Sequence, residues 1–266
     1  MAQKDYAAIA AKAITKPADI VRKPKLLIYS RNKKGKTTFC ASAGVDKTLI
    51  VDPEHGTDEM KSTNPNVWKI SRWEELDDIY NYLRYSKHPY EWVALDGLTK
   101  INNMSLKYVM RLQEEKSLDR IPGMVQQRDY GKAGELMKDL MTRFHSLDMG
   151  VVFTAQERQD EPGDSEEDDD SEETASVFIP DLPKGVRSYA NSIVDVIGRL
   201  YVVRVERGET QVAERRLWIG ESVKYDTGYR SDFTLPDYIR NPSITKVVTL
   251  MRQGKLTRPA PKKKSS

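Results

Sequence analysis

The stretch that decides the fold is IYSRNKKGKTTF, residues 28–39. A short apolar run at residues 25–29 leads into it, and a helix is expected from about residue 37 to residue 43. A strand, a glycine-lysine turn and a helix in this order predict a phosphate-binding loop, because backbone N–H groups of the turn and the start of the helix face an anion. Residues 28–39 are therefore the candidate nucleotide site.

Three residues of this loop have expected roles of their own. Gly35 has no β-carbon, so the backbone can approach the phosphates closely. Lys36 would reach the β- and γ-phosphates, and the hydroxyl of Thr37 would bind Mg²⁺. The residues predicted to bind the nucleotide are Ser30, Arg31, Asn32, Lys33, Lys34, Gly35, Lys36, Thr37 and Thr38.

Ser30 departs from the phosphate-loop pattern, which asks for glycine at this position. A serine would be strained at a positive φ, so we expect an altered turn or a lower affinity for nucleotide. Taken by itself, the stretch also fits a lysine-rich surface turn, and other parts of the chain must decide between the two.

The rest of the chain alternates between predicted helices and strands. Helices are expected at residues 5–14, 73–85, 98–116 and 131–147, and strands at residues 48–52, 92–96, 149–154, 193–205 and 214–219. Continuous apolar strands separated by helices predict an α/β fold with a mostly parallel sheet covered on both faces and extra strands at one edge. We expect an N-terminal arm at residues 1–21, an ATPase core at 22–250 and a basic flexible tail at 251–266.

Two carboxylates follow predicted strands. Asp96 ends the strand at residues 92–96, where an aspartate that holds Mg²⁺ is expected, although it also fits a helix cap. Glu54 follows the strand at residues 48–52 and could activate a water molecule for attack on the γ-phosphate, although it also fits a solvated loop. Their place after strands supports the nucleotide reading of residues 28–39.

Several blocks together resemble a known family. VDPEHGTD (residues 51–58) resembles the strand-end motif of RecA, WVALDGLT (92–99) its Walker B strand, and VFTAQER (152–158) the strand that ends in a γ-phosphate-sensing glutamine. With IPDLPK (179–184) and IVDVIGRLY (193–201), their order resembles the RecA-like P-loop ATPases of bacteriophages, the RecA-core branch of the Sak-type single-strand annealing proteins. The resemblance spans roughly residues 22–245.

This resemblance implies site residues and cofactors. It implies an ATPase that uses ATP and Mg²⁺, with Lys36, Glu54 and Gln156 catalytic and Thr37 and Asp96 at the metal. Related ATPases also carry a Lys-x-Arg pair that contacts the nucleotide of a neighbouring subunit. Lys224 and Arg230 do not have that spacing, and Arg230 is the candidate for this trans-acting cation.

The same resemblance implies an ATP-dependent recombination protein that binds single-stranded DNA, promotes annealing or strand pairing, and assembles as a homo-oligomer on DNA. The alternative is a nucleotide-binding switch or adaptor in phage DNA replication with little or no ATP turnover. Such an adaptor would recruit proteins such as a single-strand-binding protein.

Charge is unevenly distributed along the chain. The net charge is +3, but residues 160–173 carry ten acids and no base, and without them the net charge would be +13. We expect residues 160–175 to form a disordered acidic loop, either a solvated insertion or a DNA mimic that covers a basic groove. The basic remainder permits nucleic-acid binding, with contacts from the lysine-rich tail and with Tyr189 as a candidate for base stacking.

Composition limits the remaining classes. Hydrophobic residues make up 38% of the 266 residues and charged residues 31%, and no apolar run of about 18 residues occurs. With no secretory signal, the protein is expected in the cytoplasm, or the host cytoplasm if phage-encoded, with no membrane partner. Cys40 is the single cysteine, so neither an internal disulfide nor a cysteine-based zinc site can form.

Overall fold

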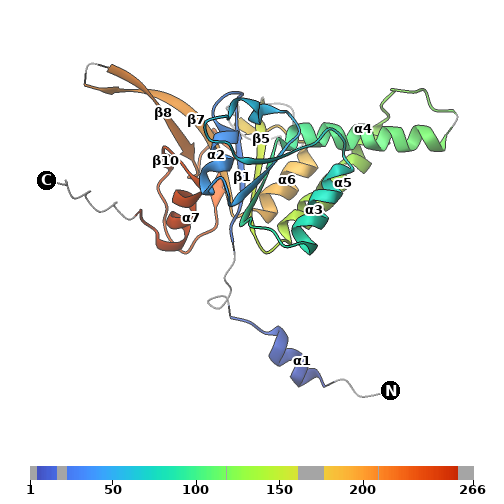
Figure 1. Ribbon diagram of the computed structural model, residues 1–266, viewed down its shortest axis with the longest axis horizontal. Helices are drawn as coiled ribbons and strands as arrows, with labels where there is room; N and C mark the ends of the chain where they lie inside the picture. Colours follow the sequence, from blue (N-terminus) through green and yellow to red (C-terminus); the bar gives the residue numbers. More distant parts are fainter. Residues whose placement is uncertain (1–4, 17–22, 118, 161–176, 209, 257–266) are drawn as a thin grey trace, which may run out of the picture.

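A ten-stranded sheet organises the chain (Figure 1). The computed structural model describes residues 5–16, 23–117, 119–160, 177–208 and 210–256. The helices are α1 (Tyr6–Ala13), α2 (Lys36–Cys40), α3 (Glu75–Tyr85), α4 (Leu98–Lys116), α5 (Gln127–His145), α6 (Lys184–Ile193) and α7 (Ile244–Gln253). The strands are β1 (Lys25–Ser30), β2 (Thr48–Asp52), β3 (Asn66–Lys69), β4 (Trp92–Asp96), β5 (Gly150–Asp160), β6 (Val177–Pro180), β7 (Val196–Arg207), β8 (Thr210–Trp218), β9 (Gly228–Tyr229) and β10 (Tyr238–Arg240).

The main path through the sheet runs β10-β8-β7-β1-β5-β4-β2-β3, so β1 lies in its interior. β1 pairs in parallel with β5 on one side and with β7 on the other, and β5 pairs in parallel with β4. All six residues of β1 are buried, as expected for a strand covered on both faces. The carboxyl ends of β1, β5, β4 and β2 therefore share one edge of the sheet.

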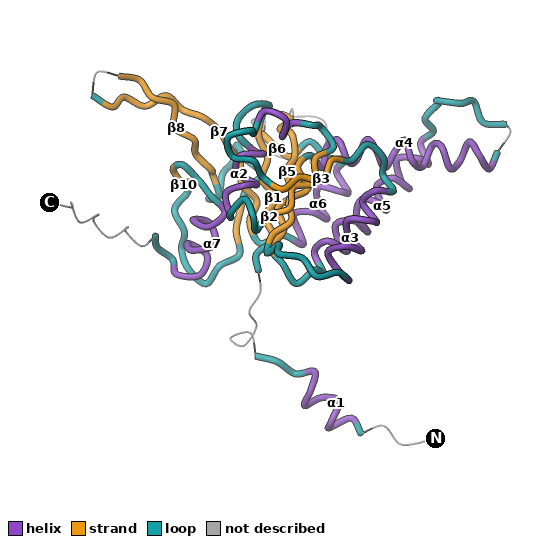
Figure 2. Tube along the Cα trace, viewed as in Figure 1, coloured by secondary structure: helices purple, strands orange, loops and turns teal. Residues whose placement is uncertain are grey.

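Helices cover the two faces of the sheet, which gives three layers (Figure 2). On one face, α3, α4, α5 and α6 pack their apolar sides against residues such as Leu27, Leu95 and Phe153. On the other face, α2 and α7 pack against residues such as Ile28 and Leu217. The α/β fold with a mostly parallel sheet flanked by helices is confirmed.

Beyond the central strands, β7 and β8 continue as an antiparallel ribbon that projects from the body at the upper left of Figure 1. The register places Tyr29 of β1 beside Arg199 of β7, and Val202, three residues further along β7, opposite Arg215 of β8. Arg215 therefore lies beyond the end of β1, at the level of the turn that follows it.

The structure adds elements that the sequence pattern did not predict. β3, β6, β9, β10, α6 and α7 were not expected, and α5 begins at Gln127 rather than near residue 131. The expected helix at residues 37–43 is α2 followed by a 3₁₀ turn, Ala41–Ala43. Most of the expected acidic loop, at residues 161–175, and the tail at residues 257–266 lie outside the described residues.

Candidate nucleotide-binding site

The turn between β1 and α2 joins a buried strand to a helix, as a phosphate-binding loop does, although Ser30 replaces the first glycine. Ser30 is the last residue of β1 and is fully buried. The positive φ angles fall at Lys33 (61°) and Gly35 (102°), and Ser30 has none. Ser30 therefore avoids the strain of a positive φ, because this chain places its left-handed residues later in the turn, and a lower affinity for nucleotide stays a prediction.

The Lys36 amine folds back over this turn. Its Nζ donates to the backbone oxygen of Ser30 at 3.2 Å and lies 3.4 Å from the Ser30 hydroxyl. Burial lowers the pKa of Lys36, while the carboxylates of Asp96 and Glu54 oppose that shift. A half-buried ammonium held only by neutral oxygens is suited to bind an anion.

Thr37 and Asp96 meet at the same edge of the sheet. Thr37 Oγ1 donates to Asp96 Oδ2 at 2.5 Å, and Thr154 Oγ1 of β5 donates to Asp96 Oδ1 at 2.6 Å. Asp96 is 7% exposed. Burial raises the pKa of Asp96, and the two hydroxyl groups partly oppose this rise. The carboxylate is thus oriented by two hydroxyl groups, and within the described part of the chain it forms no ion pair.

Thr37 and Asp96 fit a magnesium ion. Mg²⁺ is usually held by one or two protein oxygens together with phosphates and water. The hydroxyl and carboxylate oxygens of this pair are adjacent, and a divalent cation would offset the cost of burying the ionised carboxylate. The helix-cap reading of Asp96 does not match its contacts, because both of its oxygens accept from hydroxyl groups of other elements.

Glu54 lies in a loop that Asp52 organises. Asp52 accepts bonds from the backbone N–H of Glu54, Gly56 and Thr57, at 3.0, 3.3 and 2.9 Å, and from the Thr57 hydroxyl at 2.6 Å. In the sheet, β2 is separated from β1 by β5 and β4. Glu54 nevertheless reaches the site, because a β-carbon on Gly97 would lie only 3.3 Å from its Oε1.

Gln156 of β5 pairs directly with Ser30 of β1. Its backbone N–H donates to Thr99 Oγ1 at 3.1 Å, and its carbonyl accepts from the Asp181 N–H at 2.8 Å. Thr99 Oγ1 in turn donates to the Asp181 carbonyl at 2.9 Å. Gln156 thus stands between the phosphate-loop turn and the segment that follows β6.

The chain therefore brings Lys36, Thr37, Asp96, Glu54 and Gln156 to one edge of a mostly parallel sheet. Residues 22–231 match a family model described as an AAA domain. The chain belongs to this AAA-domain family. A search of curated proteins finds no match to the chain. As an AAA domain, it has the fold of the P-loop ATPases, and the match includes residues 28–39, whose role as the phosphate-binding loop stays a prediction.

Two expected residues lie away from this edge of the AAA domain. Arg230 lies at the opposite, amino end of β1, where its side chain donates to the Ser192 carbonyl at 2.5 Å and its N–H to the Asp195 carbonyl. Its role toward another subunit stays a prediction. Tyr189 of α6 is partly buried against the hydrophobic core and bonds Thr142 of α5, and its role in base stacking stays a prediction.

Two residues near the site were missed. Asp52 belongs to the DPE run, and its position immediately before Pro53 was a signal for a capped turn. Arg215 lies against Gly35: a β-carbon on Gly35 would be 2.7 Å from Arg215 Nε. No local pattern could have placed a β8 arginine on this loop, because the contact depends on the strand order.

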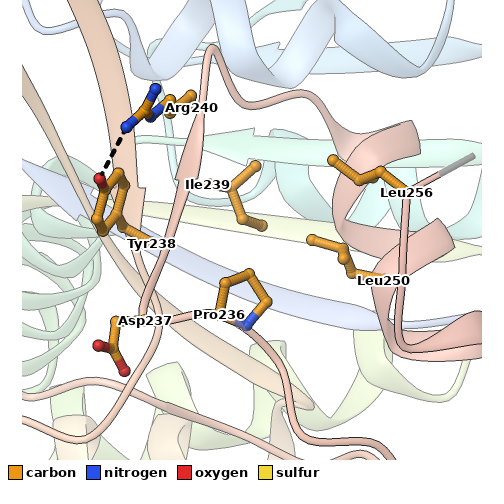
Figure 3. Close-up of a pocket in the computed structure, with 7 residues that line it drawn as sticks. All are labelled: Pro236, Asp237, Tyr238, Ile239, Arg240, Leu250 and Leu256. Carbon is orange, nitrogen blue, oxygen red and sulfur yellow. Dashed lines mark hydrogen bonds between the residues drawn. The ribbon is translucent and has the colours of Figure 1, made fainter. Parts of the chain in front are cut away.

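A separate hollow of about 570 Å³ lies between β10 and α7 (Figure 3). Its lining residues are Pro236, Asp237, Tyr238, Ile239, Arg240, Leu250 and Leu256. None of them is among the predicted nucleotide residues.

Among the described residues, no helix combines the length and apolar character needed to cross a membrane.

Proposed function

We propose that this AAA domain is an ATP-dependent recombination protein that binds single-stranded DNA, promotes annealing or strand pairing, and assembles on DNA. The observation that carries the ATPase part is the meeting of Lys36, Thr37 and Asp96 at the carboxyl edge of β1 and β4. The resemblance to the Sak-type phage proteins supports the recombination part.

In this proposal Lys36 releases Ser30 and binds the β- and γ-phosphates. Thr37 and Asp96 would hold a magnesium ion, and that ion would supply positive charge to neutralise the phosphates. Glu54 lies beside Gly97 and accepts a proton from the attacking water. Gln156 links the phosphate loop to the segment after β6, through its pairing with Ser30 and its contact with Asp181.

One surface supports nucleic-acid binding. Across β7, β8 and β10 runs an arginine–aromatic face, which consists of Phe178, Arg199, Tyr201, Arg216, Trp218, Tyr225, Tyr238 and Arg240. The Arg199 guanidinium lies 4.6 Å from the ring centre of Phe178 and 4.4 Å from that of Tyr225. Trp218 and Tyr238 stack with ring centres 6.0 Å apart.

Buried carboxylates anchor the arginines of this face. Glu157 binds Arg199 at 2.7 Å and Glu214 binds Arg216 at 2.8 Å, and the two carboxylate side chains are only 2% and 5% exposed. Arg240 lies 3.9 Å from Glu214, with 66% of its side chain exposed. The carboxylates are thus inside, the Arg199 and Arg216 side chains are only 13% and 20% exposed, and Arg240 is the well-exposed cation of this face. Arginines interleaved with aromatic rings suit a single strand, whose phosphates bind cations and whose bases stack.

Binding of a labelled oligonucleotide at rising salt concentrations, with Mg-ATP or a nonhydrolysable analogue, tests the DNA part. We expect single strands to bind more tightly than a duplex of equal length, and Arg240→Gln to lower the slope of log affinity against log salt by about 1. Arg252→Gln, an exposed arginine of α7, is the control. Absence of single-strand binding at low salt would contradict this part.

The switch or adaptor alternative has one observation in its favour, since Ser30 gives the Lys36 amine a place to rest within the loop. It predicts nucleotide binding without turnover. Steady-state phosphate release with and without single-stranded DNA separates the two functions, because the recombination ATPase must release phosphate and the switch must not.

A further inference from the structure

Arg215 lies on the phosphate loop of its own chain. A β-carbon on Gly35 would lie 2.7 Å from Arg215 Nε and 3.3 Å from both Cδ and Cζ. The guanidinium therefore packs against the Gly35 backbone, next to Lys36. Glycine is needed at position 35 for two reasons. Its φ of 102° is strained for residues with a side chain, and a β-carbon would collide with the Arg215 side chain.

The backbone of Arg215 is held firmly. It pairs with Val202 of β7, and its carbonyl accepts from the Asn241 N–H at 2.7 Å. Leu217, two residues further along β8, is buried against α2 and α7, and residues two apart on a strand point to the same face. Arg215 thus points to the α2 side of the sheet, away from the arginine–aromatic face.

The Arg215 side chain has no counter-charge. In the described part of the chain its guanidinium forms no ion pair or side-chain hydrogen bond, while the adjacent Arg216 is paired with Glu214. Arg215 is exposed, and Lys33, Lys34 and Lys36 of the loop lie in the same region. Unpaired cations gathered at one turn repel one another, and a polyphosphate would remove that repulsion.

We propose that Arg215 binds the phosphate chain of the nucleotide in cis, that is, in the phosphate loop of the same subunit. This inference rests on the proposed function, and it makes one cation of the site independent of a neighbouring subunit. An arginine in this place can donate two parallel hydrogen bonds to phosphate oxygens. Arg230, at the far end of β1, is not needed for this contact.

The test uses the full chain and measures Mg-ATP binding by calorimetry and phosphate release at steady state. We expect Arg215→Ala to weaken ATP binding by about tenfold or more, because a hydrogen-bonded charge pair is lost, and Arg215→Lys to weaken it less. The matched control is Arg204→Ala, an exposed arginine of β7 on the same ribbon. Melting temperatures establish that each variant is folded.

Mixing two defective variants separates cis from trans action. Lys36→Ala keeps Arg215, and Arg215→Ala keeps Lys36. A cis contact predicts that an equal mixture releases no more phosphate than the average of the two variants measured separately. Recovery of activity in the mixture, or wild-type ATP affinity of Arg215→Ala, would overturn the inference. If Lys36→Ala itself binds ATP as tightly as the wild type, the proposed function fails instead.

Discussion

Thr37 and Asp96 are 59 residues apart in the chain, yet Thr37 Oγ1 donates to Asp96 Oδ2 at 2.5 Å. The contact requires that β5 stand between β1 and β4, because Thr154 of β5 binds the other oxygen of Asp96 at 2.6 Å. A hydroxyl of the phosphate loop and a buried carboxylate thus meet where a magnesium ion would bind. The following predictions depend on this arrangement.

Asp96→Asn should abolish Mg-dependent ATP hydrolysis and yet stabilise the fold at neutral pH. Burial raises the pKa of Asp96 above that of an unfolded aspartate, so its ionised form costs stability in the folded state. The gain from asparagine is full above the raised pKa and disappears as the pH falls below the ordinary aspartate value. Melting temperatures of both proteins across this pH range measure it. A variant less stable than the wild type at neutral pH would contradict the prediction.

Glu54→Gln should retain Mg-ATP binding and lower the turnover rate by about a hundredfold or more, as expected when a general base is lost. The amide keeps the size of the side chain beside Gly97 but cannot take a proton from water. Single-turnover phosphate release measures the chemical step, and Glu59→Gln, an exposed glutamate after the same loop, is the control. Turnover at the parental rate would remove Glu54 from the mechanism.

ATP affinity should fall in alkaline solution at a lower pH than an ordinary lysine would allow. Burial lowers the pKa of Lys36, so its amine loses its charge earlier as the pH rises, and the neutral amine binds phosphate weakly. Calorimetric titrations from about pH 7 to about pH 10 would measure the decline. The arginine of the Lys36→Arg variant stays charged over this range. The ATP affinity of this variant, whatever its value at about pH 7, should therefore not show the same decline.

Removing the Glu157 carboxylate should destabilise the fold. Glu157 binds both Arg31 and Arg199, and its side chain is 2% exposed. Glu157→Gln leaves the Arg199 guanidinium, itself 13% exposed, without its counter-charge, at a cost of about 3 kcal/mol. Arg31→Gln is the control, because the Arg31 side chain is 66% exposed and surface ion pairs contribute little. Urea unfolding midpoints of the two variants would differ clearly if this is correct, and equal midpoints would contradict it.

The apolar runs at residues 25–29, 48–52 and 92–96 were enough to predict the buried strands and hence the α/β class. The glycine-lysine turn and the strand-end carboxylates then predicted which residues would meet. What local pattern could not supply was the order of the strands, which brings Arg215 onto Gly35 and places β5 between β1 and β4. The helix α7 was not predicted, although its buried residues Ile244, Val247 and Leu250 have helical spacing. Short edge strands precede it and the basic tail follows it, so the helical segment did not stand out in the sequence.

Ser30 shows a second limit of the sequence pattern. A consensus motif assigns glycine to a position, but the backbone conformation depends on how the whole turn is built. In this chain the left-handed conformations fall at Lys33 and Gly35, and Ser30 remains in the strand. The serine hydroxyl instead lies near the Lys36 amine.

The central claim is that a triphosphate with magnesium binds where β1 meets α2. Calorimetric titration of ATP into the full chain, with Mg²⁺ and with a chelator, compares the wild type with Lys36→Ala. The account predicts binding of one ATP per chain that is tighter with Mg²⁺ and is lost or greatly weakened in Lys36→Ala. Equal ATP affinity of the two proteins, or no ATP binding by the wild type, would contradict it.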